Sequence, residues 1–152
     1  MRAANKIGYE IMKTNYGVVV RLYRIMRFFQ ERKCFFLAKV MCYTIRILFG
    51  CAIPPTTILK EGVRIAHGIG IVLHQDTVIG ERTVIYQNVT VGNAGGPKIG
   101  ADCILGAGCV ILGNIKIGNN VKIGANAVVL QDVPDNCTAV GVPARIIKRE
   151  KK

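Results

Sequence analysis

The chain has 152 residues, of which 51% are hydrophobic, and a formal net charge of +12 at pH 7. This length suits one domain with its own hydrophobic core. The sequence has no run of about twenty uncharged apolar residues, so it predicts no ordinary membrane span, and its first residues do not follow the pattern of a signal peptide. Nucleic-acid binders join positive charge to a recognisable module or to stacking aromatic side chains, and the sequence has neither. We expect a cytoplasmic protein that binds no nucleic acid.

Residues 1–50 form a basic extension with ten Lys and Arg against two Glu, a net charge of +8. Residues 1–17 are polar and mixed and predict little. Residues 18–32 have the pattern of an amphipathic basic helix, and residues 34–49 that of a far more apolar helix of about 24 Å. These helices either cap the following domain and pack between subunits, or lie on an anionic membrane surface through residues 18–49. The two roles are compatible.

Residues 53–133 repeat every six residues, with an aliphatic residue leading each hexad and a small or β-branched residue four places later. Such a repeat is typical of a solenoid in which three hexads form one triangular coil of about eighteen residues. Stacked coils share one core. We expect the glycines that follow the leading residues to permit turns that would strain other residues. The leading residues are Ile53, Leu59, Ile65, Leu73, Ile79, Ile85, Val91, Ile99, Leu105, Ile111, Ile117, Ile123 and Val129.

The fold class that follows is an all-β solenoid with a short N-terminal α-helical extension. Pro54 and Pro55 end the extension, because proline cannot continue a helix. The solenoid domain is predicted over residues 51–148, with residues 138–147 returning along it, and residues 149–152 form a charged tail.

Two steps of the repeat are eight residues long instead of six. The first runs from Ile65 to Leu73 and contains His67, and the second runs from Val91 to Ile99 and contains the loop 93–97. The regular steps define the scaffold, so the two interruptions predict where a site lies.

One edge of the predicted solenoid combines His67 with small side chains. His67, Gln87, Ala107 and Ala125 are each the third residue of hexads that lie one coil apart, so the register stacks them. Coils are about 4.8 Å apart, which puts His67 roughly 15 Å from Ala125. Small side chains along an edge leave a groove. A long thin ligand suits it, such as a pantetheine arm with its thioester at the histidine.

The chain resembles the left-handed β-helix acyltransferases. The resemblance rests on the hexads, the segment from Gly62 to Leu73, the run 105–130 and the ending Gly141-Val-Pro-Ala-Arg145. Within that family the chain is most similar to serine acetyltransferases and to the small capsule and exopolysaccharide O-acetyltransferases related to them. The resemblance covers about residues 51–148. It implies a left-handed parallel β-helix, a homotrimer with active sites between subunits, and direct transfer of acetyl from acetyl-CoA to an acceptor hydroxyl.

The resemblance also implies roles for individual residues. His67 would be the general base, which suits a group that titrates near neutral pH, and backbone groups at Ala107 and Ala125 would contact coenzyme A. The predicted cofactor contacts are Gln87, Gly92, Gly106, Ala107, Ala125, Arg145 and Lys148.

Three of the further roles stay open at this point. Backbone amides near Gly92 could stabilise the developing oxyanion. Lys148 could meet the phosphates of coenzyme A, although a solvated tail explains it equally well. His74 is a candidate substrate contact that a surface position also explains.

Three positions depart from the serine acetyltransferases. Ala52 and Ala66 stand where those enzymes have aspartates, and Gly96 stands where they have a second active-site histidine. The absent groups bind the amino acid or support the base. We therefore expect the acceptor to be a sugar hydroxyl of a surface polysaccharide or its precursor. One alternative is an L-serine O-acetyltransferase of cysteine biosynthesis, and another, of a different class, is a non-catalytic trimeric solenoid.

The sequence predicts no metal site. The zinc site of a trimeric β-helix carbonic anhydrase needs three histidines, and the chain has two. The six cysteines show no C-x-x-C pair and no metal-ligand spacing. Cys103 and Cys109 occupy inward positions of the repeat, where a cysteine acts as a small buried hydrophobe. We expect reduced thiols.

Overall fold

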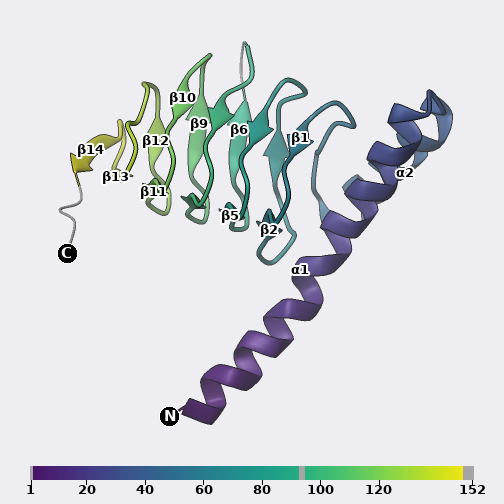
Figure 1. Ribbon diagram of the computed structural model, residues 1–152, viewed down its shortest axis with the longest axis horizontal. Coiled ribbons are helices and arrows are strands. Elements are labelled where there is room, and N and C mark those ends of the chain that lie inside the picture. Colours follow the sequence, from purple (N-terminus) through teal and green to yellow (C-terminus); the bar gives the residue numbers. More distant parts are fainter. Residues whose placement is uncertain (1, 93–94, 149–152) are drawn as a thin grey trace.

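The computed structural model describes residues 2–92 and 95–148, with side chains described from Gly17 onward. Two helices come first, α1 (Arg2–Glu31) and α2 (Phe35–Phe49). They form a hairpin at one end of a stack of coils, and the C-terminus lies at the other end (Figure 1). α1 is longer than the predicted helix over 18–32, whereas α2 matches the predicted segment 34–49. Among the described residues, neither helix is both long and apolar enough to cross a membrane.

The end of α2 follows from one glycine. Gly50 takes a left-handed backbone with φ +62°, and its N–H donates to the carbonyl oxygen of Arg46 at 3.0 Å. Glycine adopts this conformation without strain, which is why it commonly closes the last turn of a helix. The chain then enters the first coil at Cys51.

The solenoid consists of short strands in three sheets, one on each face of the triangular coil. Two sheets have the orders β1-β4-β7-β10 and β12-β9-β6-β3, and the third has the order β14-β13-β11-β8-β5-β2. Up to β12, neighbouring strands are parallel and three elements apart, as the predicted three-hexad coil requires. The strands are β1 (Ile58–Leu59), β2 (Arg64–Ile65), β3 (Val72–Leu73), β4 (Val78–Ile79), β5 (Val84–Ile85), β6 (Thr90–Gly92), β7 (Lys98–Ile99), β8 (Ile104–Leu105), β9 (Val110–Leu112), β10 (Lys116–Ile117), β11 (Lys122–Ile123), β12 (Val128–Val129), β13 (Cys137–Val140) and β14 (Arg145–Lys148).

The leading residues of the hexads point inward and build the core, as predicted. From Leu59 to Val129, each of them is at most 6% exposed. In the regular six-residue steps the positions four places later are buried too, among them Cys103 and Cys109, whereas Ile69 and Gly95 in the two eight-residue steps are exposed. Burial raises the pKa of the Cys109 thiol to about 12, so this thiol stays protonated at neutral pH. All six cysteines are unpaired.

The glycines that follow the leading residues permit close stacking of the coils. Gly80, Gly100 and Gly118 lie along one edge, and none of them has a positive φ. A Cβ added to Gly100 would lie 2.5 Å from the carbonyl oxygen of Gly118 in the next coil. The prediction that these glycines relieve strained turns is therefore wrong. Left-handed corners fall elsewhere in the hexad, at residues such as Asn88 and Asn126, whose short polar side chains tolerate this conformation.

Helix α1 extends the core of the solenoid at its N-terminal end. The buried side chains of Val19, Tyr23 and Met26 belong to the same hydrophobic cluster as Ile53 and Leu59. The helical extension and the solenoid therefore share one continuous core, although the sequence marks a boundary near residue 50.

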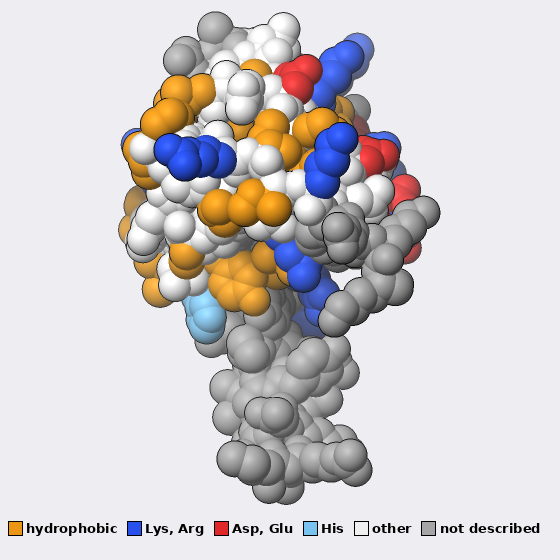
Figure 2. All heavy atoms as spheres, turned by 90° about the vertical axis from the view of Figure 1, so that its left-hand side faces the viewer, with side chains coloured by type: hydrophobic (Ala, Val, Ile, Leu, Met, Phe, Trp, Pro, Cys, Tyr) orange, Lys and Arg blue, Asp and Glu red, His pale blue; other side chains and the backbone are white. Residues whose placement is uncertain are grey.

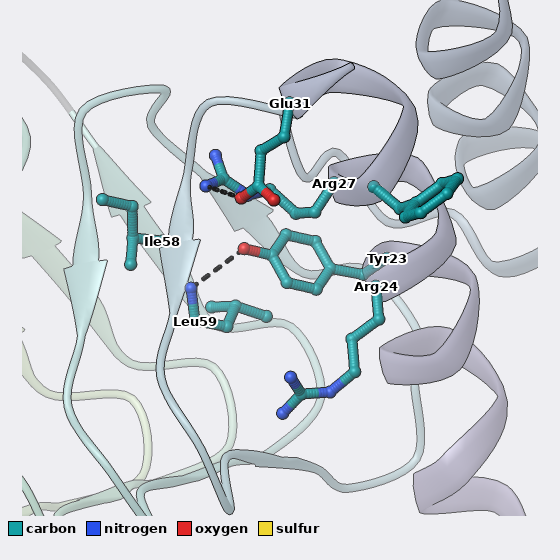
Figure 3. Close-up of a pocket in the computed structure, with 7 residues that line it drawn as sticks. Tyr23, Arg24, Arg27, Glu31, Ile58 and Leu59 are labelled. Atoms are coloured by element: carbon teal, nitrogen blue, oxygen red, sulfur yellow. Dashed lines mark hydrogen bonds and ion pairs between the residues drawn. The ribbon is translucent and has the colours of Figure 1, made fainter.

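The Tyr23 hydroxyl binds the exposed edge of the first coil. It donates a hydrogen bond to the carbonyl oxygen of Thr57 at 2.7 Å. It also accepts one from the N–H of Leu59 at 3.0 Å (Figure 3). Arg27 adds a bond to the carbonyl oxygen of Pro55 at 3.0 Å. Burial raises the pKa of Tyr23. An open strand edge can pair with another chain, and these contacts occupy the edge of β1.

At the other end of the solenoid, β13 continues the third sheet and β14 folds back antiparallel to it. The chain therefore reverses as predicted, but β14 returns along β13 at the end of the sheet and not along the coils. Seen from this end, the surface carries apolar side chains interspersed with Lys and Arg, with the acidic side chains gathered at one side (Figure 2). Val142 and Ile147 are among its exposed apolar residues.

The stacking role of the glycines predicts a difference between two similar substitutions. Gly100→Ala is expected to lower the free energy of unfolding by roughly 1–3 kcal/mol, because extra atoms in a packed interior displace their neighbours. Gly92→Ala is the matched control, since Gly92 also follows a leading residue but an added Cβ there meets no atom within 4 Å. Its effect should stay within about 0.5 kcal/mol. Urea unfolding at one protein concentration measures both, and equal losses would contradict the stacking explanation.

Candidate active site

His67 and Gly68 are the two extra residues of the first eight-residue step. The residue before this pair, Ala66, donates its N–H to the next coil at 2.7 Å. The residue after it, Ile69, accepts an N–H from the next coil at 3.0 Å. The hydrogen-bond ladder is thus intact on both sides, and the pair bulges out of it.

The edge column differs in one member from the predicted one. Gln87 and Ala107 each accept an N–H from the next coil at 2.9 Å, in the same way as Ile69 does. The strand register also carries Ala125 above them. The ladder therefore stacks Ile69, Gln87, Ala107 and Ala125, and the prediction that His67 stands in this column is wrong. The insertion displaces the histidine to a place beside the first member of the column.

The backbone of the inserted pair is left-handed, with φ +63° at His67 and +35° at Gly68. A side-chain-bearing residue in this region costs roughly 1–2 kcal/mol. The regular left-handed corner of this coil is at Gly70, with φ +68°, outside the inserted pair. The scaffold therefore does not require the conformation of His67. Strained positions of this kind cluster at functional sites.

The His67 side chain is exposed at a pocket of about 240 Å³. The rest of the lining is apolar and comes from three elements, and it comprises Val18, Val19, Leu48, Phe49, Gly68 and Ile69. In the part of the chain that the structure describes, the imidazole has no hydrogen-bond or ion-pair partner. A water-exposed imidazole without a partner is available to accept a proton from a bound hydroxyl.

The helical wall of this pocket is the part of the site that sequence reasoning missed. Val18 and Val19 belong to α1, and Leu48 and Phe49 to α2. The apolar periodicity of these helices predicted that each has a buried face. The periodicity did not indicate which part of the solenoid that face would pack against.

Two of the departures from the serine acetyltransferases lie where the structure leaves no room for a larger side chain. Ala66 is fully buried. Gly96 has φ +60°, and an added Cβ would lie 2.5 Å from the carbonyl carbon of Asp76. Ala52 is only half-buried, and its backbone pairs with that of Val72. A side chain at position 96 would therefore require the backbone to move, and a larger side chain at position 66 would need space that its neighbours fill.

Gln87 shows the strongest sign of an absent ligand among the predicted cofactor contacts. Its Oε1 atom is buried without a hydrogen-bond partner in the described part of the chain. Such an oxygen costs about 1–3 kcal/mol, which a donor on a ligand would recover. Ala107 is half-buried and Ala125 is exposed, so the column beyond Gln87 presents only methyl groups.

The two glycines of the predicted cofactor site have different surroundings. A Cβ added to Gly106 would lie 2.7 Å from the backbone N of Ala125, so coil stacking by itself explains this glycine. Gly92 faces open space. Coil stacking therefore does not explain this glycine, and its contact with a cofactor stays a prediction.

The basic residues of β14 lie at opposite ends of that strand. Arg145 pairs with Val140, next to the edge column, whereas Lys148 pairs with Cys137. Three residues of strand separate them by about 10 Å. Both are exposed, but only Arg145 lies near the end of the column.

His74 is separated from His67 by the length of β3, and it does not line the pocket. Its Nδ1 atom accepts a hydrogen bond from the N–H of Asp76 at 3.2 Å and lies 3.7 Å from the Asp76 carboxylate. These contacts with Asp76 give the His74 side chain a local structural role. Its contact with a substrate stays a prediction. The described residues contain no group of three His, Cys, Asp or Glu that could hold a metal ion.

Comparison with known proteins identifies relatives along most of the chain. The family model for the bacterial transferase hexapeptide (six repeats) matches residues 96–131. The serine acetyltransferase of Helicobacter pylori (strain ATCC 700392 / 26695) is 36% identical, with 98% of this chain and 90% of the relative covered. That of Bacillus pumilus is 35% identical over 94% of this chain and 69% of the relative. That of Synechococcus elongatus is 38% identical over 84% of this chain and 54% of the relative.

Solved structures agree with these relatives. A serine acetyltransferase in complex with CoA is 38% identical with a TM-score of 0.81, covering 85% of this chain and 55% of that one. The Neisseria gonorrhoeae serine acetyltransferase in complex with serine is 37% identical with a TM-score of 0.80, covering 84% and 54%. The chain thus spans about half the length of these two proteins and of the Synechococcus relative. It belongs to the serine acetyltransferase-like family of left-handed β-helix acyltransferases built from hexapeptide repeats.

Proposed function

We propose that the chain is an acetyl-CoA-dependent O-acetyltransferase with His67 as its general base and L-serine as its acceptor. The observation that carries the proposal is the two-residue insertion, which presents a strained, exposed histidine at one of the two interruptions of the repeat. The comparisons favour serine over the sugar that the sequence predicted, because the relatives described above are named serine acetyltransferases and one was solved with serine.

The chemistry requires a base at the acceptor hydroxyl. Acetyl-CoA supplies the thioester carbonyl. Neutral His67 takes the hydroxyl proton while the oxygen forms a bond to the carbonyl carbon, and the carbon–sulfur bond then breaks. The imidazolium returns its proton to the departing thiolate. Backbone N–H groups near Gly92 are the proposed donors to the oxyanion.

Features of the edge column fit a pantetheine arm. The unpartnered Gln87 Oε1 would accept a hydrogen bond from an amide N–H of the arm. The methyl groups of Ala107 and Ala125 leave its path open. Arg145, at the end of the column, would meet the phosphates of coenzyme A, with Gly106 and Lys148 as flanking contacts.

A sugar hydroxyl is the second candidate acceptor, and the pocket at His67 favours it. An amino acid brings an ammonium and a carboxylate, which need partners in a site. Apart from the imidazole, the described pocket lining has no titratable group, and Gly96 cannot hold a side chain without backbone movement. A glycan of a surface polysaccharide or its precursor carries hydroxyls without those charges.

The proposal includes a homotrimer in the cytoplasm. Three copies would let residues of a neighbouring subunit complete the open side of the pocket at His67. A cytoplasmic location agrees with the six unpaired cysteines, since thiols stay reduced in that compartment.

His67→Asn is expected to lower the rate of acetyl transfer by about 10²–10⁴-fold, the usual contribution of a general base. Asparagine tolerates a positive φ, so the insertion should keep its shape. The rate is measured as CoA release from acetyl-CoA with an acceptor. Sedimentation and CoA titration calorimetry serve as controls and should match the parent chain. A variant that retains more than about a tenth of the rate would show that His67 is not the base.

Ala125→Leu and Ala107→Leu are expected to weaken acetyl-CoA binding while changing stability little. The exposed Ala125 gives the cleaner case, because its methyl group points to solvent and a leucine there would fill the groove. Isothermal calorimetry measures the affinity. Unchanged affinity in both variants would refute the groove, and a parent chain that binds no CoA would favour a non-catalytic solenoid.

Parallel reactions with different acceptors test which acceptor the protein uses. Purified protein with acetyl-CoA is expected to release CoA and form O-acetylserine when L-serine is added, because the relatives are named for that substrate. The parallel reaction contains monosaccharides and capsular oligosaccharides in place of serine. Transfer to a glycan with no O-acetylserine formed would replace serine by the sugar acceptor and leave the role of His67 intact.

A further inference from the structure

Helix α2 has an apolar face that no described part of the chain covers. Phe36 is 78% exposed and Ile47 79%, with Val40 and Tyr43 about half exposed between them. Their spacing of four, three and four residues puts all four on one side of the helix. The opposite side is fully buried at Ala38 and Ile45. A contiguous exposed patch of this kind marks an interaction surface.

Cations line one flank of this face. Lys39 and Arg46 are exposed and seven residues apart, so they form a stripe beside the four apolar residues. Arg32 and Lys33 add two exposed cations at the turn before α2. The sequence from residue 32 to residue 60 has no acidic residue at all. The partner of this surface is therefore apolar where it meets the face and anionic where it meets the flank.

We propose that α2 docks on an anionic lipid membrane. Phe36, Val40, Tyr43 and Ile47 then lie at the boundary of headgroups and acyl chains, and Lys39 and Arg46 bind lipid phosphates. α2 has 15 residues, a length of about 22 Å, whereas a bilayer core is about 30 Å thick. The helix therefore lies in the plane of the membrane surface.

Charge complementarity favours lipid over a second copy of this chain. A second copy would have to offer carboxylates to the cationic flank. Its own cations already use the acidic side chains in several cases, and others accept backbone N–H bonds. The engaged residues are Glu31, Glu81, Asp102, Asp132 and Asp135. Among the described residues this leaves the carboxylates of Glu61 and Asp76, both on the solenoid, to meet the cationic flank of a second copy. Two flanks brought together would repel each other.

Helix α2 contributes to the candidate active site as well, through a different side from the docking surface. Leu48, 66% exposed, belongs to the last turn of α2 and also lines the pocket at His67. A membrane bound to α2 would lie next to this pocket. The membrane proposal itself does not depend on which acceptor is used.

Vesicle co-sedimentation of the full chain tests the proposal. The protein is mixed with vesicles of equal parts phosphatidylglycerol and phosphatidylcholine, or of phosphatidylcholine alone, at low and high ionic strength. Binding is expected to the anionic vesicles and to weaken as salt screens the charges. Lys39→Gln with Arg46→Gln should lower the partition coefficient about thirtyfold, the effect of two cations at an anionic surface. Phe36→Ser with Ile47→Ser should lower it at least as much.

Matched controls separate a local effect from a general one. Lys116→Gln with Lys122→Gln removes the same charge from exposed positions on the solenoid and should leave binding within about twofold. Leu130→Ser with Ile147→Ser removes two exposed apolar residues far from α2 and should do the same. Equal losses in these controls, or no binding of the parent chain at low salt, would overturn the proposal. Dissociation of an oligomer by Phe36→Ser with Ile47→Ser, measured by sedimentation equilibrium, would assign the face to a second copy instead.

Discussion

The backbone hydrogen bonds between coils are the constraint on which the rest of this structure depends. Each strand is only two to four residues long, so no strand is stable by itself. Stability comes from stacking, because every coil donates to the next and covers its inward side chains. The same ladder fixes the distance between coils at about 4.8 Å. At Gly80, Gly100 and Gly118 this short distance leaves no space for a side chain larger than the hydrogen atom of glycine. The ladder also sets the register that aligns Gln87, Ala107 and Ala125.

The regular part of the hydrogen-bond ladder builds only the scaffold. The candidate site lies where two extra residues interrupt the repeat. The insertion of His67 and Gly68 adds two residues without disturbing the bonds at Ala66 and Ile69. The added segment is short and has a left-handed backbone. It pushes the imidazole out of the edge, toward a wall supplied by the helices. The next coil on one side and helix α1 on the other hold this strained segment in place, which is how a scaffold positions a functional residue.

The surroundings of His67 bear on the choice of acceptor. In this family the chain's relatives are named for serine, yet the described lining of its pocket is apolar and the two positions at Ala66 and Gly96 are closed to larger side chains. A neighbouring subunit in a trimer could supply the charged groups that serine needs. Helix α2 supplies Leu48 and Phe49 to this wall and, on another side, the face proposed to contact lipid, so one helix serves both.

The sequence by itself determined the period, the inward residues and the two interruptions. A six-residue repeat is a local, one-dimensional signal: each coil contacts only its neighbours, so residue spacing along the chain fixes position in space. The edge column at Gln87, Ala107 and Ala125 could be predicted for that reason. Tertiary structure decided three other things: which two residues of the eight-residue step leave the ladder, that glycines serve stacking, and that Val18, Val19, Leu48 and Phe49 line the pocket at His67. These depend on long-range packing of helices against a coil and of one coil on the next, which no period in the sequence encodes.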